Sequence, residues 1–378
     1  MDFDYTQEQQ AIRDTFTRFV KDRVTPQAEA IDEAKDFPAE LFAEVGKLGF
    51  YGMRYPEADG GSDAGIVAYI LAVEELARGS LSLAAACTMQ SLMGTYFVHK
   101  LGSDELKQRL FRPALQGDKL GTICMTEPDA GSDLGGIKTR AIQDGEEYVL
   151  NGSKIWITQA PVADFFTVFA KVGEGDDAPL GIFLVERGNP GLQVGRNIDK
   201  LGVRSSVTSE VFFEDCRVPA EGVLDSSGRG MEYLREILNE IRIMTAALAL
   251  GGARGALEDA VAYAKERKQL GRPIVKFQAM QIHIAEMATE LEAARRLTEY
   301  AAWRAEQDLP RTKEASMAKL FASEAAYRVC DRASRVMAAY GYAMEYPIQR
   351  YFRDVRFTLF GGGTSEMMQF TIAREVAR

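Results

Sequence analysis

The residues Cys124-Met-Thr-Glu-Pro-Asp-Ala-Gly-Ser-Asp133 and Asn151-Gly-Ser-Lys-Ile-Trp-Ile-Thr158 lie in the first half of the chain. The first stretch places polar side chains around a proline and a glycine, which is typical of a turn whose backbone N–H groups are free to bind a ligand. In the second, a strand would place Trp156 and Thr158 on the same face, because side chains alternate along a strand. A planar ligand with hydrogen-bonding groups fits both stretches. From spacing alone, a polar turn and a strand with a buried tryptophan is the simpler interpretation.

The bulk composition predicts a soluble globular protein. Of the 378 residues, 46% are hydrophobic and 26% are charged, and the net charge of -10 argues against nucleic acid or an anionic membrane as the main partner. The four cysteines are far apart and form no CxxC pair, so we expect free thiols in a reducing cytoplasm and no metal site. Met1-Asp-Phe-Asp lacks the basic start of a signal peptide, and no apolar run is expected to span a bilayer.

The hydrophobic period changes twice and predicts a mostly α protein with a β middle domain. Residues 1–120 indicate an N-terminal helical domain, with apolar residues at helical spacing after Thr6. Residues 121–225 contain short β-branched and aromatic runs, which predict a small antiparallel β domain, either barrel-like or a pair of packed sheets. We expect a hairpin turn at Asn151-Gly152 within it. Residues 226–378 predict a four-helix bundle. Its long helices are expected at 232–266, 278–308 and 313–339, before a last helix capped by Thr364.

Several blocks of the sequence resemble the acyl-CoA dehydrogenase family of flavoproteins. Cys124–Asp133 resembles the first family signature, and Lys154–Thr158 resembles the strand that covers the flavin. The resemblance extends from Tyr5-Thr-Gln-Glu-Gln to Thr364-Ser-Glu-Met, and the blocks keep the family order and spacing, so it is highly specific. It implies the same helical, β and four-helix-bundle order and a bound FAD. Gly251-Gly-Ala-Arg-Gly follows no strand, so a Rossmann turn is not predicted.

The resemblance places the flavin between the β domain and the bundle. It implies that the Met125 backbone and the Thr126 hydroxyl bond the polar edge of the flavin, and that Ser132 bonds the pyrophosphate and the acyl-CoA. Trp156 would cover one face of the ring, and Thr158 would approach its N5 side.

Ala264-Lys-Glu-Arg-Lys-Gln-Leu-Gly-Arg-Pro-Ile resembles a further block. Arg267 matches the arginine that meets the flavin pyrophosphate of a neighbouring subunit, and a guanidinium near a helix end suits an anion. A solvated arginine is the more common alternative. Gln278 agrees with the family pattern, whereas Leu270 replaces the usual phenylalanine, so part of the stacking on the cofactor is lost.

The region after Val336 resembles the second family signature, with two departures. Arg335 replaces a glutamine, and Ala338-Ala339 replace a glycine pair near the adenosine part of FAD. The arginine adds a phosphate contact, while the alanines hold the backbone farther from the cofactor. The resemblance also assigns Thr364 and Glu366 to the cofactor site.

The reaction implied by the resemblance removes an α-proton and a β-hydride from an acyl-CoA thioester and gives the 2-enoyl-CoA. A carboxylate in an apolar pocket suits the proton transfer, because desolvation raises its pKa. The family base stands before a Gly-Thr-Ser-like turn, which is Gly362 here, or before a bundle-helix arginine, which is Arg242 here. The second position is Ile241. Glu240 is one residue away, about 100° around an ideal helix.

Three explanations of the missing base are open. In the first, Glu240 is the base because the helix is locally shifted. In the second, another polar group acts as the base, either from the N-terminal helices or from elsewhere in the pocket. In the third, the reaction is not ordinary desaturation. Gly361 and Gly362 also vacate volume near the first acyl carbons, so they suit a branched or cyclic acyl group. A flexible turn before the last helix is the simpler interpretation. Arg242 is expected to hold the CoA portion.

The resulting prediction is an FAD-dependent acyl-CoA dehydrogenase. By resemblance it passes electrons to an electron-transfer flavoprotein and forms a homotetramer. The first alternative is a related flavoenzyme with altered chemistry: a thioester reductase, an elimination enzyme, an oxidase or a hydroxylase. The second is a catalytically silent subunit in a heterotetramer with an active homologue.

Overall fold

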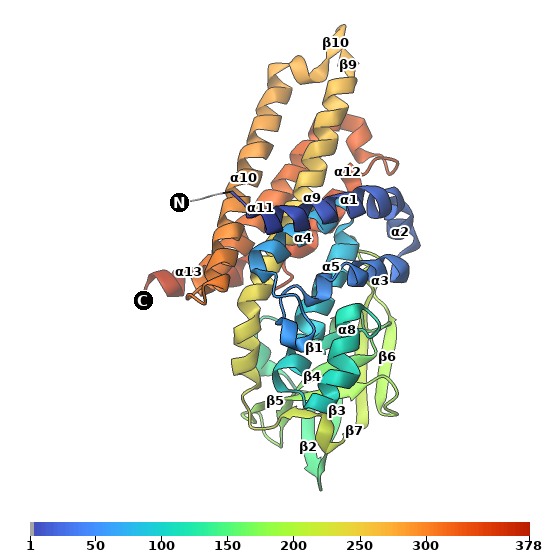
Figure 1. Ribbon diagram of the computed structural model, residues 1–378, viewed down its shortest axis with the longest axis vertical. Helices are drawn as coiled ribbons and strands as arrows, with labels where there is room; N and C mark the ends of the chain where they lie inside the picture. The colour runs from blue at the N-terminus through green and yellow to red at the C-terminus, as the bar shows by residue number, and fades with distance from the viewer. Residues whose placement is uncertain (1–3) are drawn as a thin grey trace.

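The computed structural model describes residues 4–378. Met1–Phe3, part of the stretch in which the sequence predicts no signal peptide, lie outside the described residues. Helices from both ends of the chain pack beside a twisted sheet, and the sheet and the tip of the long helices lie at opposite ends of the longest axis (Figure 1). The N-terminal helices are α1 Gln7–Phe19, α2 Ala28–Ala34, α3 Ala39–Lys47, α4 Gly65–Gly79, α5 Leu81–Met89, α6 Tyr96–Leu101, α7 Asp104–Leu106 and α8 Arg112–Gln116.

Local capping signals start the first helix where the sequence predicts it. Thr6 accepts a hydrogen bond from the Gln9 N–H, and the Gln9 side chain accepts one from the Thr6 N–H, which completes a capping box. The segment Leu81–Leu101 corrects one expectation, because by length and hydropathy it could cross a membrane. However, 78% of that window is buried inside the protein, which is the position of a core helix.

The middle of the chain forms one mixed sheet rather than an antiparallel one. Its strands run in the order β6-β7-β3-β2-β4-β5-β8, and β1 pairs in parallel with β4. The β2–β4 pair is also parallel, and the other pairs in this sheet are antiparallel. The strands are β1 Gly121–Cys124, β2 Arg140–Asp144, β3 Glu147–Thr158, β4 Phe165–Val172, β5 Leu180–Glu186, β6 Leu192–Asn197, β7 Thr208–Val218 and β8 Val223–Asp225.

The predicted hairpin turn at Asn151-Gly152 is wrong, because both residues lie inside β3. A side chain at Gly152 would overlap with Thr139, and the pairing with β7 shifts register here, so the pair marks a bulge. The turn lies earlier, at Gly145 (φ +68°), between β2 and β3. Asn151 is held by Asp215, a contact across 64 residues that a local pattern does not contain.

The C-terminal part contains the three predicted long helices. They are α9 Gly230–Glu266, α10 Gln278–Glu306 and α11 Thr312–Met337. The short strands β9 Lys268–Gln269 and β10 Arg272–Pro273 connect α9 to α10. Two shorter helices follow, α12 Ile348–Val355 and α13 Ser365–Val376, and Thr364 caps α13 as predicted. The predicted division at residues 120/121 and 225/226 follows these changes in secondary structure and stays a prediction.

Ion pairs fasten the three parts of the chain to one another. Asp32 of α2 accepts from Arg204, in the β6–β7 loop, at 2.9 Å, and from Arg353 of α12. The neighbouring Asp354 is buried and accepts a hydrogen bond from the Val203 N–H at 2.7 Å. The β6–β7 loop is therefore fixed to both helical parts, which holds the sheet against the bundle.

Candidate active site

A buried ion pair supports the turn after β1. The Lys154 ammonium of β3, which is fully buried, donates to the Glu127 carboxylate at 2.8 Å and to the Met125 and Phe169 carbonyls. Glu127 also accepts from the Lys138 and Thr139 backbone N–H groups. These contacts fix the backbone of the Cys124–Asp133 turn, so its outward-facing groups are held in place before any ligand arrives.

Trp156 presents its ring to solvent from a strained backbone. Its φ is +61°, in the left-handed region that a bulky residue rarely adopts, and its side chain is 55% exposed. The pairing with β7 slips between Lys154 and Ile157, and the Ile155 N–H donates to the Thr126 carbonyl. The bulge thus turns the indole away from the sheet toward an open face, and the expectation of a buried tryptophan is wrong.

Three hydroxyls of the turn after β1 and of β3 have no protein partners. In residues 4–378, the side chains of Thr126, Ser132 and Thr158 make no hydrogen bond to another residue, and Ser132 is exposed. A flat exposed ring beside free hydroxyls and a rigid turn fits a planar cofactor with a hydrogen-bonding edge and a phosphate tail. The residues therefore fit the FAD that the sequence implies.

The two family positions for the base meet each other and are both without a carboxylate. Gly362, with φ +71°, faces α9, where an added Cβ would lie 3.3 Å from Ile241 Cγ2 and 3.0 Å from Thr245 Oγ1. Thr245 itself donates to the Ile241 carbonyl at 2.8 Å. The space beside Gly361 and Gly362 is therefore lined by apolar atoms and one hydroxyl.

Glu240 reaches a different neighbour. Its carboxylate forms an ion pair with Arg54, from the loop before α4, and the two side chains are only 15% and 5% exposed. The Arg54 guanidinium also lies over the Tyr96 ring. The structure thus brings Ile241 to Gly362, while Glu240 is engaged by the N-terminal helices.

Two cations without carboxylate partners border the glycine loop. Arg242 of α9 donates only to neutral groups, Ser316 at 3.2 Å and Asn239 at 3.5 Å, and its buried Nε has no partner. Lys319 of α11 is fully buried and donates to the Gly363 and Leu359 carbonyls. Burial lowers the pKa of Lys319 to about 8, and the positive charge of Arg242 also lowers this pKa.

The remaining predicted cofactor residues lie in two other places. Arg267 ends α9 with its guanidinium over the Tyr340 ring, 5.6 Å from the centroid, and Gln278 begins α10. Arg335 is exposed and forms an ion pair with Asp331 at 2.7 Å. This end of the bundle is opposite the sheet (Figure 1). Thr364 and Glu366 start α13 beside the glycine loop.

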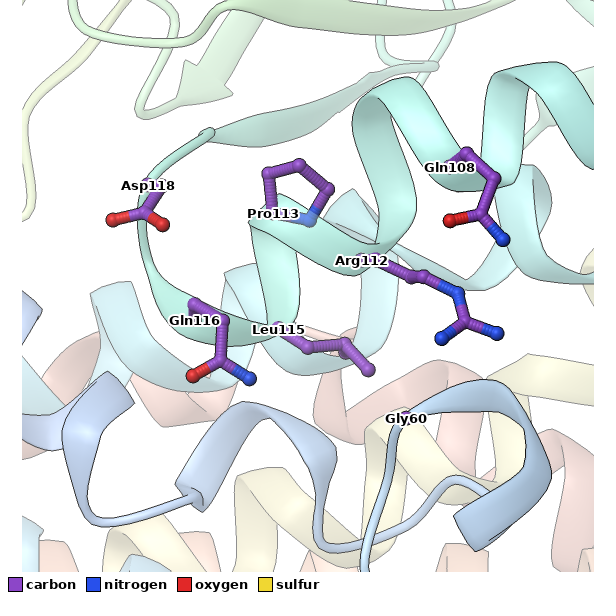
Figure 2. Close-up of a pocket in the computed structure, with 7 residues that line it drawn as sticks. All are labelled: Gly60, Gln108, Arg112, Pro113, Leu115, Gln116 and Asp118. Carbon is purple, nitrogen blue, oxygen red and sulfur yellow. The ribbon is translucent and has the colours of Figure 1, made fainter.

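Within a single chain, the predicted cofactor residues therefore do not lie together at one site. Thr245 and Arg267 are 22 residues apart on one helix, which corresponds to about 33 Å. Figure 2 shows a cavity of about 350 Å³ that belongs to neither group. It contains no predicted site residue and is lined by Gly60, Gln108, Arg112, Pro113, Leu115, Gln116 and Asp118.

Four residues around the site were given no role from the sequence: Glu127, Lys154, Arg54 and Lys319. Lys154 and Glu127 are 27 positions apart in the sequence, and Arg54 and Glu240 are 186 positions apart. Neither ion pair can therefore be recognised from a pattern of neighbouring residues. Lys319 sits in an ordinary amphipathic helix. A weak signal exists only for Lys154, which interrupts the alternation of a strand with a charge.

Comparisons with known proteins match the whole chain. Models of the N-terminal, middle and C-terminal domains of acyl-CoA dehydrogenase match residues 6–118, 122–216 and 228–377. The chain is 58% identical over 378 residues to benzylmalonyl-CoA dehydrogenase of Aromatoleum aromaticum, and the match covers 100% of both chains.

Two solved structures have the same fold over 100% of both chains. One is butyryl-CoA dehydrogenase from Megasphaera elsdenii, with a TM-score of 0.96 and 36% identity. The other is a chain in the structure described as the electron transferring flavoprotein of Acidaminococcus fermentans, with a TM-score of 0.97 and 38% identity.

Proposed function

Because this chain belongs to the acyl-CoA dehydrogenase family, and so binds FAD and oxidises the CH–CH bond of an acyl-CoA thioester, we propose that its acyl group carries a carboxylate on the α-carbon. One observation carries the proposal: Gly362 and Ile241 leave both base positions without a carboxylate. The similar protein from Aromatoleum aromaticum is named for benzylmalonyl-CoA, whose α-carbon bears such a group.

An α-carboxylate removes the need for a base. The C–C bond to the carboxylate breaks, CO₂ leaves, and the electron pair left on the α-carbon forms the new double bond as a hydride departs from the β-carbon. Bound FAD supplies the two-electron acceptor for that hydride. The carboxylate brings one negative charge and the reduced cofactor keeps one, so no proton is transferred to the protein. The product is the 2-enoyl-CoA that is one carbon shorter.

The absence of a side chain at the family base position supports this substrate class. The breaking bond must stand perpendicular to the thioester plane, so its electron pair can merge with the carbonyl π system. In a base-containing relative, the glutamate would occupy the space on that side. Here Gly361 and Gly362 carry no side chain, so no carboxylate of the protein would compete there with that of a benzylmalonyl-type group. Ile241 lines this space with apolar atoms, which disfavours a localised charge and promotes loss of CO₂.

The experiment follows the flavin without oxygen. Benzylmalonyl-CoA should bleach the flavin absorbance and release one equivalent of CO₂ with 3-phenylpropenoyl-CoA. The decarboxylated analogue, 3-phenylpropanoyl-CoA, should bind without bleaching, and in D₂O its α-protons should not exchange. Bleaching by 3-phenylpropanoyl-CoA at a comparable rate, with α-exchange, would reveal a working base and overturn the proposal. Flavin that stays oxidised with both ligands would instead favour the silent-subunit alternative.

The thioester-reductase alternative has less support. Reduction of an enoyl-CoA must deliver a proton to the α-carbon, and the protonated base would supply it. With Gly362 and Ile241 at both positions, that donor is missing as well. The same missing group therefore argues against both ordinary desaturation and its reverse.

The cofactor contacts belong to this proposal. Exposed Trp156 and the partner-free hydroxyls of Thr126, Ser132 and Thr158 would hold the flavin on the sheet side. The groups at the far tip of the bundle would meet the FAD of a second copy, since one chain cannot bring them to its own sheet. The proposed FAD contacts are Met125, Thr126, Ser132, Trp156, Thr158, Thr364 and Glu366 on one chain, with Arg267, Gln278 and Arg335 from a second copy.

The partners follow from the family membership. We propose an electron-transfer flavoprotein as the acceptor and a homotetramer as the assembly. The bundle supports the second point, because large apolar side chains on α10 and α13 are exposed on the single chain. They are Ile282, Tyr300, Trp303 and Phe370, which are 46–66% exposed. A cytoplasmic location stays a prediction.

A further inference from the structure

Arg242 lacks the carboxylate partners that Arg54 and Arg254 have. Arg254, on the same helix, pairs with Glu74 at 2.8 Å and Glu75 at 2.6 Å, and Arg54 pairs with Glu240. In contrast, Arg242 forms no ion pair in residues 4–378 and donates only to Ser316 and Asn239, which are neutral. Its buried Nε has no hydrogen bond, as is also true of Arg54 and Arg254. A desolvated guanidinium with unused N–H groups is costly unless an anion completes it.

The position of Arg242 indicates where that anion lies. The residue before it, Ile241, and the residue three positions after it, Thr245, both lie against Gly362. Ser316, which accepts from Arg242, is one turn before Lys319, whose ammonium donates to the Gly363 carbonyl at 2.6 Å. Arg242 on α9 and Lys319 on α11 therefore lie on the two helices that contact the glycine loop, where the family pattern places a glutamate.

The nearby acidic side chains do not neutralise this charge. Glu324 accepts a hydrogen bond from the Ser365 hydroxyl at 2.7 Å, and Glu366 is exposed in the first turn of α13. Neither lies within ion-pair distance of Arg242 or Lys319 among the described residues. Glu324 and Glu366 act on Lys319 only through space, and Arg242 is left without a carboxylate partner.

We propose that Arg242 binds the α-carboxylate of the substrate, and that Lys319 positions the glycine loop and adds positive charge beside it. The inference rests on the proposed function and adds to it the residue that selects 2-carboxyacyl thioesters. The α-carboxylate of the substrate would supply, beside the glycine loop, the negative charge that a glutamate at the family base position would otherwise supply. Arg242 acts in binding, while the apolar side of the space, at Ile241, faces the bond that breaks.

The test compares two ligands that share the same CoA and the same ring. Dissociation constants for benzylmalonyl-CoA and 3-phenylpropanoyl-CoA are measured from the flavin spectrum, the first under rapid mixing before bleaching. In Arg242→Gln, the dissociation constant for benzylmalonyl-CoA should rise about tenfold to a hundredfold, the loss of a charge-assisted contact. The dissociation constant for 3-phenylpropanoyl-CoA should change less than threefold. Arg242→Lys should recover part of the difference.

Arg235→Gln is the matched control, since Arg235 is an exposed arginine on the same helix. Equal weakening of both ligands in Arg242→Gln would place the guanidinium on the CoA phosphates and overturn the inference. This outcome is distinct from failure of the proposed function, which would appear in the wild-type protein as the absence of CO₂ release. Retained flavin and an unchanged thermal midpoint show that each variant is folded, and Arg242→Lys provides a second variant if Arg242→Gln loses FAD.

Discussion

Gly362 and Ile241 together explain why a base cannot simply be restored at the glycine. A glutamate at Gly362 would need a φ of +71°, and its Cβ would press against Thr245 Oγ1 at 3.0 Å. Ile241 lies in the middle of α9, where a glutamate is an ordinary helix residue. Position 241 is therefore where the chemistry can be changed without a change in backbone.

Ile241→Glu should convert the specificity. The new carboxylate would lie in a desolvated site, which raises its pKa and suits it to abstract an α-proton. We expect flavin bleaching by 3-phenylpropanoyl-CoA to appear, while the rate with benzylmalonyl-CoA falls at least tenfold because two carboxylates repel. Both are measured by anaerobic stopped flow. Ile241→Gln has the same shape without charge, so bleaching of 3-phenylpropanoyl-CoA in that variant would contradict the role of the carboxylate.

The variant Glu240→Gln tests whether Glu240 acts as a base or only as a structural residue. If the Arg54 ion pair defines its role, the variant keeps at least a third of the wild-type bleaching rate. It should nevertheless be less stable, because removing one partner of a buried pair leaves a charge uncompensated, at a cost of about 3–5 kcal/mol at most. The thermal midpoint and the anaerobic rate are measured together. Complete loss of bleaching by benzylmalonyl-CoA in a folded, FAD-loaded variant would show that Glu240 takes part in the reaction, and would contradict a purely structural role.

At the scale of elements, the sequence predicts what local chemistry controls. Thr6 and Thr364 cap helices at the predicted residues, because a cap depends on groups three positions away. Asn151-Gly152 was misassigned because Thr139 and Asp215, which are distant in sequence, make it a bulge. The site shows the same division. Trp156 was found from its motif, but its exposure depends on a register shift that spacing cannot show.

The turn after β1 depends on β3 through Lys154, so a change at this residue should reach the cofactor. In Lys154→Met the Glu127 carboxylate loses its ion-pair partner, and the backbone at Met125 loses a hydrogen-bond donor. We expect the dissociation constant for FAD to rise at least tenfold on reconstitution of the apoprotein, although Lys154 faces away from the ligand. Lys138→Met, which removes an exposed pair with Asp129, is the control. Wild-type FAD affinity in Lys154→Met would show that the turn is rigid without it.

Across the whole molecule, the contact between the β6–β7 loop and α12 should make stability depend on pH. Burial raises the pKa of Asp354 from 3.8 to about 6 in the folded protein. Between about pH 4 and 6 the folded state therefore holds a proton that the unfolded chain releases, so this residue lowers the free energy of unfolding as pH rises. Asp32 acts in the opposite direction. Burial raises its pKa, but bonds to Arg204 and Arg353 bring it below the ordinary value, so its contribution is lost as pH falls.

Asp354→Asn should remove the first of these effects. The amide oxygen can still accept from the Val203 N–H, while the charge is gone. We expect a higher thermal midpoint than wild type at pH 7.5, and a smaller difference or none at pH 4. Asp36→Asn, at an exposed position, should leave the profile unchanged. A midpoint difference that does not vary with pH would show that Asp354 stays charged in the folded protein.

The two groups of predicted cofactor residues lie at opposite ends of the molecule, so the assembly and FAD retention should be coupled. Trp303→Glu combined with Phe370→Glu places charges on the exposed apolar faces of α10 and α13, far from the Trp156 ring in sequence. We expect the protein to dissociate in sedimentation, and the dissociation constant for FAD to rise more than tenfold because contacts at Arg267 of a second copy are lost. Leu48→Glu, at a similarly exposed N-terminal position, should change neither quantity. A dissociated chain that holds FAD with wild-type affinity would mean that one copy completes its own cofactor site, and that the tip of the bundle serves another purpose.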